Sequence, residues 1–234
     1  MTKARSIYAV DVGSPKNGLA WARLREDEST PTGGVDLNVL CTAMVSDLVE
    51  GRAVCMGFEA PVFLPVAHEA NDLCKARLGE RGRPWSAGAG VYVSAVVLPV
   101  AAWILERTAL GCGAERPRLS FQTEDWAGTA SAQTEPVFLI WEAFVSGRGH
   151  AREPNEYGLP EHVQDAATAA IAFKQWSGRD PRPPSHVSTD RALNTVAAAA
   201  LWAGWDVGTL ALHTSALVLW PEECLGAGVR AHDV

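Results

Sequence analysis

The sequence is poor in cysteine pairs and in positive charge, and it has no apolar run of membrane-spanning length. The number of cysteines is odd and no two of them form a CxxC motif, so neither a disulfide framework nor a zinc knuckle is expected. The five cysteines are Cys41, Cys55, Cys74, Cys112 and Cys224. This cysteine usage fits a reducing compartment, and we therefore expect a cytoplasmic protein.

Acidic residues outnumber basic ones. Lys and Arg total 20 against 27 Asp and Glu, which gives a formal net charge of -7. An acidic chain is not expected to coat nucleic acid non-specifically, because such binding depends on neutralising phosphates, but a local basic segment is compatible with this balance. The composition, 47% apolar and 20% charged over 234 residues, is typical of one large globular domain.

No membrane-spanning or secretory segment is predicted. The longest apolar run, residues 91–105, contains Pro99 and is too short to cross a bilayer, so it predicts a buried helix. Asp11 interrupts the only stretch near the N-terminus that resembles the apolar part of a signal peptide. The sequence therefore predicts no membrane partner, and formation of a homodimer stays open.

Apolar runs and turn residues predict the order of the secondary-structure elements. Residues 6–11, 18–25 and 37–45 are predicted strands joined by short connections, which favours an antiparallel meander. Two unbroken apolar runs, residues 53–59 and 137–145, are typical of strands covered on both faces. Helices are predicted at residues 91–109, 160–176 and 189–205.

This order predicts an α/β fold with a mixed five-stranded sheet flanked by helices. Three antiparallel strands come first, and parallel strands follow them. We expect one domain over residues 1–234, with inserted loops at residues 68–90 and 111–135. A helix followed by a hairpin, residues 189–221, is expected to close the domain.

Acidic residues stand at or near the carboxyl ends of three predicted strands. Asp11 ends the first strand, Glu59 ends the fourth, and Glu142 lies within the fifth. Such a carboxylate loses hydration at a cost of several kcal/mol, and these strands offer it no basic neighbour. Since ligand sites lie at this edge of α/β sheets and hard cations prefer oxygen ligands, we expect a divalent cation there.

A predicted helix adds a fourth acid and a histidine to this set. His162 and Asp165 lie three residues apart near the start of the helix, so their side chains share one face. Histidine can carry a proton near neutral pH or bind a metal ion. Each residue also has an ordinary explanation as a turn, cap or first-turn residue or, for Glu142, as the partner of an arginine. The argument for a shared site is the order in which these residues occur, on the first, fourth and fifth predicted strands and then on a helix.

Short motifs in this order resemble the ribonuclease H superfamily, and within it the predicted-nuclease family called domain of unknown function 429. The motifs are Ala9-Val10-Asp11-Val12-Gly13, Gly57-Phe58-Glu59-Ala60-Pro61, residues 74–83, Trp141-Glu142 and Asp165-Ala166-Ala167. The sequence departs from that family in having Glu59 where Asp is frequent and His162 where a second acid is common.

The resemblance implies a ribonuclease H-like fold and phosphodiester hydrolysis by two Mg²⁺ or Mn²⁺ ions. It implies that Asp11 bridges both ions and that Glu59 and Glu142 hold one ion each. It further implies that Asp165 completes the second site, with His162 beside it as a ligand or a proton carrier. The activity expected from this resemblance is that of a metal-dependent nuclease.

A basic segment after Glu59 favours nucleic acid, of a type that the sequence leaves open, as the substrate. The guanidinium group matches phosphate geometry, and a neighbouring tryptophan can stack on a base. The candidate contacts are Lys75, Arg77, Arg81, Arg83 and Trp85.

Two alternatives stay open at this point. A ribonuclease H-like domain can serve as a non-catalytic interaction or scaffold module, and the net charge of -7 and the presence of His162 favour this alternative. Asp11-Val12-Gly13 also resembles the first phosphate loop of actin-like ATPases. We expect that third possibility to fail, because the chain ends too soon after Gly208 for a second lobe.

Overall fold

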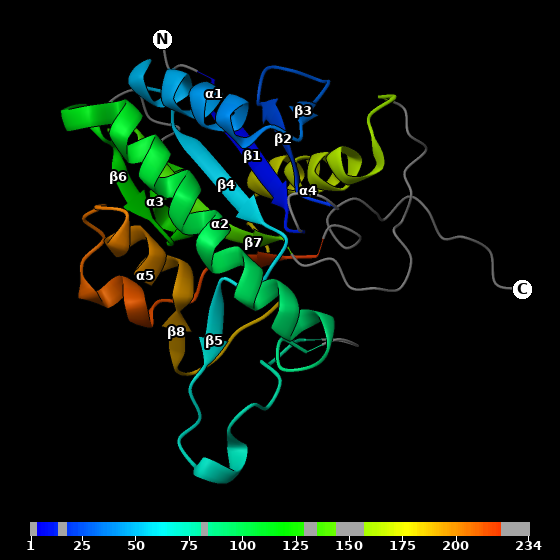
Figure 1. Cartoon of the computed structure of the whole chain (residues 1–234), viewed down its shortest axis with the longest axis vertical. Helices are drawn as coiled ribbons and strands as arrows, with labels where there is room; N and C mark the ends of the chain where they lie inside the picture. Colours follow the sequence, from blue (N-terminus) through cyan, green and yellow to red (C-terminus); the bar gives the residue numbers. More distant parts are fainter. Residues whose placement is uncertain (1–3, 14–17, 81–83, 129–134, 144–156, 221–234) are drawn as a thin grey trace, which may run out of the picture.

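The computed structural model describes residues 4–13, 18–80, 84–128, 135–143 and 157–220, which form an α/β fold (Figure 1). Within these residues a mixed sheet has the strand order β3-β2-β1-β4-β7-β6, and β9 also pairs with β7. Its strands are β1 (Ser6–Asp11), β2 (Ala20–Arg25), β3 (Thr32–Gly34), β4 (Val54–Phe58), β6 (Arg118–Ser120), β7 (Val137–Ala143) and β9 (Val218–Leu219). A separate antiparallel pair consists of β5 (Phe63–Pro65) and β8 (Ala192–Asn194).

Helices cover both faces of this sheet. Figure 1 shows α1 and α2 in front of the sheet and α4 behind β1 and β2. The α-helices are α1 (Leu37–Val49), α2 (Ala89–Cys112), α3 (Thr123–Gly128), α4 (Glu161–Ser177) and α5 (Thr195–Trp202). Short 3-10 helices are η1 (Ala70–Asp72), η2 (Gly113–Glu115) and η3 (Thr209–His213).

The central strands bring their carboxyl ends to one edge of the sheet. β1 pairs with β2 antiparallel and with β4 parallel, and β4 pairs with β7 parallel. In this register Val10 lies opposite Phe58, and Phe58 lies opposite Glu142. The predicted strands at residues 6–11, 18–25, 53–59 and 137–145 and their mixed pairing are confirmed, apart from residues 144 and 145, which lie outside the described residues.

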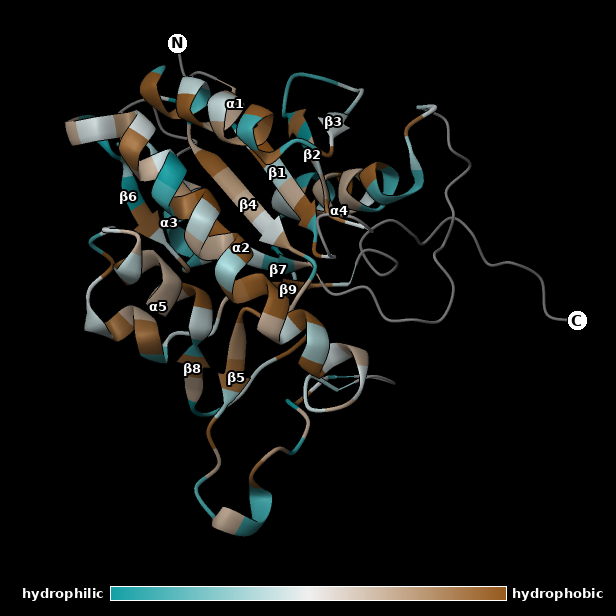
Figure 2. Cartoon of the chain, in the orientation of Figure 1, coloured by the Kyte–Doolittle hydropathy of each residue, from teal (hydrophilic) through white to brown (hydrophobic). Residues whose placement is uncertain are grey.

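Successive strand residues contribute to two separate cores. Tyr8, Val10 and Phe58 pack in the core on the α1 and α2 side, whereas Ala9 and Cys55 pack in the core on the α4 side. Figure 2 draws β4 mainly in the hydrophobic colour, as expected for a strand buried on both faces. Because side chains alternate along a strand, the residue that follows each strand also has a defined face.

The predicted strand at residues 37–45 is wrong, because these residues form the first part of helix α1. Asp36 caps this helix, since its side chain accepts a hydrogen bond from the Asn38 N–H at 2.8 Å. Leu40, Met44 and Leu48 recur every four residues and are buried. The third strand of the antiparallel meander is instead β3, in a stretch that the sequence had indicated to be a polar connection.

The predictions for two inserted or terminal segments also need correction. Residues 111–135 include strand β6 and helix α3, so the described sheet has more than the five predicted strands. The expected helix at residues 189–205 is preceded by β8 and begins after Asn194, whose side chain accepts from the Ala197 N–H at 2.8 Å. In place of the predicted hairpin, the described residues contain η3 and then β9, which runs parallel to β7.

Helix α2 is longer and more exposed than the predicted buried helix. It has 24 residues, and the helical stretch Ala89–Glu115 is long and apolar enough to cross a membrane by length and composition alone. Of its most apolar window, 28% is buried in the structure. Its C-terminal half buries Ala101, Ile104 and Leu105, whereas Val91 and Tyr92 at the other end are exposed. The predicted burial therefore holds for the C-terminal half of the helix and is wrong for its N-terminal end.

Candidate metal centre

Two acids and a histidine meet where β1 ends and α4 begins. One potential ligand atom from each of Asp11, His162 and Asp165 lies within 4.8 Å of the other two. His162 Nδ1 lies 2.8 Å from Asp11 Oδ2, in hydrogen-bond contact. The three-residue spacing puts His162 and Asp165 on one face of α4, and α4 packs against β1 and β2. The predicted grouping of these three residues is present in the structure.

Glu59 brings a third carboxylate close to this cluster. Its N–H donates to the Val10 carbonyl at 2.9 Å, which extends the parallel pairing and puts Glu59 beside Asp11. Its Oε2 is buried and has no hydrogen-bond partner in the described part of the chain. Burial, together with the negative charges of Asp11 and Asp165, raises the pKa of Glu59 well above its usual range. The Glu59 carboxyl group therefore lies close to two other acidic side chains, and no hydrogen bond to its buried oxygen offsets their repulsion.

The residues of this cluster fit a hard divalent cation. Mg²⁺ and Mn²⁺ take carboxylate oxygens. Neutral imidazole is also a common metal ligand. A buried carboxylate oxygen without a hydrogen bond is costly unless something positive approaches it. Asp11, Glu59, Asp165 and His162 could together hold one ion at this edge of the sheet.

Glu142 does not join the cluster, and its expected role as a metal ligand is corrected. It lies opposite Phe58 and so points to the α1 and α2 side, away from the face of Asp11 and Glu59. Its two carboxylate oxygens each accept a hydrogen bond from Arg77 at 2.7 Å. The ion pair with an arginine, which the sequence left as the ordinary explanation, is the one that applies.

Arg77 is likewise not an exposed phosphate contact, because its side chain is fully buried. Its guanidinium group binds Glu142 and also Glu80, at 2.8 Å. Burial acts to lower the pKa of Arg77, but the two carboxylates outweigh it, so the pKa is raised above its ordinary value. The expected role of Arg77 in substrate binding is corrected: this residue neutralises two buried acids.

The other predicted substrate contacts lie on the same segment. Lys75 is exposed and pairs with Asp72 at 2.6 Å. The Trp85 indole N–H donates to the Lys75 carbonyl at 3.0 Å, so this ring is tied to its own loop. Arg81 and Arg83 lie outside the described residues.

Sequence reasoning missed two residues of this region. Glu80 binds Arg77 three residues away, and the sequence does not indicate that the same arginine also binds Glu142. Gly18 packs against His162, and a Cβ at position 18 would lie 3.0 Å from the imidazole Cε1. Its φ of +94° is also one that other residues rarely adopt. The only available signal was a glycine just before a strand.

Gly18→Ala is expected to weaken divalent-cation binding by displacing the His162 ring. The backbone strain alone should cost about 1–3 kcal/mol of folding free energy. Gly51→Ala is the matched control, since Gly51 also has a positive φ, +77°, but has nothing within 4 Å of the added Cβ. Calorimetric titration with Mn²⁺ measures the effect, and equal affinities of the two variants would contradict the role given to Gly18.

Glu59→Gln is expected to stabilise the cation-free protein at neutral pH. The folded state raises the pKa of Glu59, so it binds a proton more tightly than the unfolded state does. Cation-free wild type should therefore lose stability as pH rises from the usual glutamate pKa toward the raised one. The variant should lack this loss and melt about 2–4 °C higher, the shift that ~1 kcal/mol produces at this size.

Thermal melts from pH 4 to pH 8 in EDTA test this expectation. The same melts with Mn²⁺ form the control, because the cation should raise the melting temperature of wild type more than that of the variant. A variant that melts at or below the wild-type temperature throughout this range in EDTA would show that Glu59 is not under repulsion.

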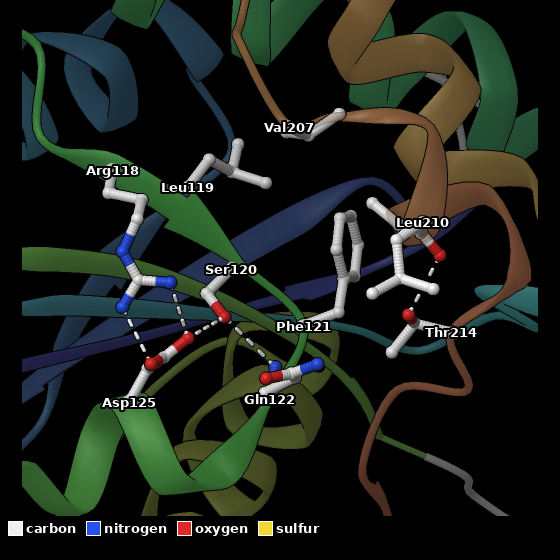
Figure 3. Close-up of a pocket in the computed structure, with 10 residues that line it drawn as sticks. Arg118, Leu119, Ser120, Phe121, Gln122, Asp125, Val207, Leu210 and Thr214 are labelled. Carbon is white, nitrogen blue, oxygen red and sulfur yellow. Dashed lines mark hydrogen bonds and ion pairs between the residues drawn. The ribbon is translucent and has the colours of Figure 1, made fainter.

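A small pocket of about 120 Å³ lies at another edge of the sheet, around β6 (Figure 3). Arg118 and Asp125 line it and form an ion pair, and Asp125 also bonds to Ser120. Leu210 and Val207 close its apolar side. The pocket shares no residue with the acidic cluster, and its two charged side chains neutralise each other.

Comparison with known proteins gives no indication of function, so the function is argued from the acidic cluster. No protein-family model, curated protein or solved structure matches this chain.

Proposed function

We propose that this protein is a divalent-metal-dependent phosphodiester hydrolase that acts on nucleic acid. The observation that carries the proposal is that Asp11, His162 and Asp165 meet at one point, with the unpartnered buried oxygen of Glu59 close to them. Carboxylates gathered in this way favour a bound cation. The resemblance of the surrounding motifs to the ribonuclease H superfamily supports phosphodiester hydrolysis as the reaction.

The side chains divide the work between cation binding and proton transfer. When bound, Mg²⁺ or Mn²⁺ supplies a Lewis acid that polarises a phosphoryl oxygen and lowers the pKa of water. Asp11, Glu59 and Asp165 hold the cation. The His162 side chain is 53% exposed, so substrate and water can reach it. With one ring nitrogen bonded to Asp11, its other nitrogen can accept a proton from the attacking water.

The removal of Glu142 leaves fewer ligands for a cation than the sequence indicated. Without Glu142, three carboxylates are left for the one or two ions of the proposed site, with His162 beside them as the proton carrier. Calorimetric titration with Mn²⁺ gives the number of ions directly, and a stoichiometry of one would replace the two-ion arrangement that the resemblance implies.

A cleavage assay with matched variants tests the proposal. Labelled single-stranded, duplex and branched DNA and RNA are incubated with Mg²⁺ or Mn²⁺. EDTA should abolish cleavage, and Asp11→Asn should slow it by about 100-fold or more. Asp36→Asn is the matched control, because Asp36 is an exposed helix cap and asparagine caps equally well.

Three outcomes contradict the proposal in different ways. Cleavage that survives both EDTA and Asp11→Asn comes from a contaminant. Cation binding without cleavage of any substrate favours the non-catalytic module. If no cation binds, the cluster is not a metal site and the proposal is wrong.

A further inference from the structure

The turn that follows Glu59 is fixed by three side chains from distant parts of the chain. The Val62 N–H donates to Glu142 Oε2 at 2.9 Å, and the Phe63 carbonyl accepts from Arg77 at 3.1 Å. The Val62 carbonyl accepts from the Thr195 hydroxyl at 2.9 Å. Glu142 and Arg77 therefore hold the backbone three and four residues beyond the cluster carboxylate.

The ion pair that makes these contacts is costly to bury. The side chains of Arg77, Glu80 and Glu142 are all 0% exposed. Burying such a pair often contributes little net stability compared with apolar residues of similar volume. The bidentate pairing of Arg77 with Glu142, in contrast, fixes the position of the groups that these two side chains bond. Stability alone does not account for this arrangement.

Glu59 itself needs support from its surroundings. Repulsion from Asp11 and Asp165 acts to push its carboxyl out of the cluster. The Glu59 N–H is bonded to the Val10 carbonyl on one side, and Val62 is bonded to Glu142 on the other. A turn held at both ends resists that displacement.

We infer that Arg77 and Glu142 are positioning residues that keep Glu59 in the metal centre by clamping residues 60–63. This inference rests on the proposed function, since it assigns a cation to that centre. The Glu142 side chain and its partner Arg77 lie on the other side of the sheet from Asp11 and Glu59. They act through the backbone on the opposite face of the sheet.

The test replaces the buried charges together. The variant combines Arg77→Met, Glu142→Met and Glu80→Gln, so that no buried charge is left unpaired. Residue 80 then keeps one oxygen, which can accept from one of the two backbone N–H groups that Glu80 binds. Calorimetry with Mn²⁺ should show a dissociation constant raised about 10- to 100-fold, as for other groups that orient metal ligands. Amide exchange at Glu59, followed by NMR without metal, should become faster.

Asp47→Asn is the matched control. Asp47 is also a buried carboxylate with an arginine partner, Arg25 at 2.8 Å, and it accepts from the Tyr8 hydroxyl at 2.6 Å. Its loss should lower the melting temperature but leave the Mn²⁺ affinity and Glu59 exchange unchanged. A merely structural role for the Arg77 pair would give the same pattern as this control.

Each remaining outcome has a defined meaning. Unchanged Glu59 exchange and Mn²⁺ affinity in the triple variant overturn the inference. If wild type binds no Mn²⁺, the proposed function fails, and Glu59 exchange alone decides whether the clamp exists. If the triple variant does not fold, Glu142→Gln replaces it: a smaller shift in the same direction supports the clamp, and no shift overturns it.

Discussion

Asp11→Asn is expected to lower the rate of phosphodiester cleavage by about 100-fold or more, as the loss of one preorganised electrostatic group does. Asp11 is central to the cluster, since it bonds to His162 and its charge acts on Glu59. Asparagine keeps the shape of the side chain and removes only the charge. Cleavage rates at saturating Mn²⁺, together with calorimetric Mn²⁺ affinity, measure the effect.

The control for this result is again Asp36→Asn, which makes the same chemical change at a helix cap outside the cluster. The melting temperature in EDTA should not fall for Asp11→Asn, because the variant relieves repulsion on Glu59. A variant that cleaves at the wild-type rate would exclude Asp11 from the reaction.

Arg77→Ala is expected to destabilise the fold by about 3–5 kcal/mol, the usual cost of removing one partner from a buried ion pair. Two carboxylates, those of Glu142 and Glu80, would be left buried without their cation. Urea unfolding at pH 7 measures the change in the free energy of unfolding.

Lys75→Ala is the comparison for Arg77→Ala. Lys75 belongs to the same basic segment, but its side chain is 68% exposed and pairs with Asp72 at the surface. Its replacement should change stability by less than about 0.5 kcal/mol. If Arg77→Ala were as stable as Lys75→Ala and only weakened binding to nucleic acid, Arg77 would be the phosphate contact that the sequence indicated.

Local patterns predicted the central strands and the residues that meet in the cluster. Apolar runs ending in an acid correctly indicated β1 and β4, and the three-residue spacing of His162 and Asp165 correctly indicated a shared face. These features depend on short-range geometry, which residue spacing encodes. The strand predicted at residues 37–45 was wrong because the apolar side chains there fit both the strand and the helix periodicity. The cap at Asp36 favours the helix.

The face of Glu142 and the partner of Arg77 could not be predicted. Every residue of β7 is buried, so the hydrophobic pattern carries no information about which side of the sheet each side chain faces. Arg77 and Glu142 are 65 residues apart, and only the folded chain brings them together. A basic residue in a charged loop looks the same in sequence whether it binds solvent, phosphate or a buried acid.

The unpartnered oxygen of Glu59 has a consequence for the proposed cation, which would compete with a proton for this carboxyl group. In the cation-free protein the raised pKa lets this carboxyl keep its proton at a pH where a free glutamate has lost it. A cation that binds there must displace that proton, so its uptake releases acid into the buffer and its apparent affinity increases with pH. If the proposed cation binds, the occupancy of the centre therefore depends on pH as well as on the supply of metal.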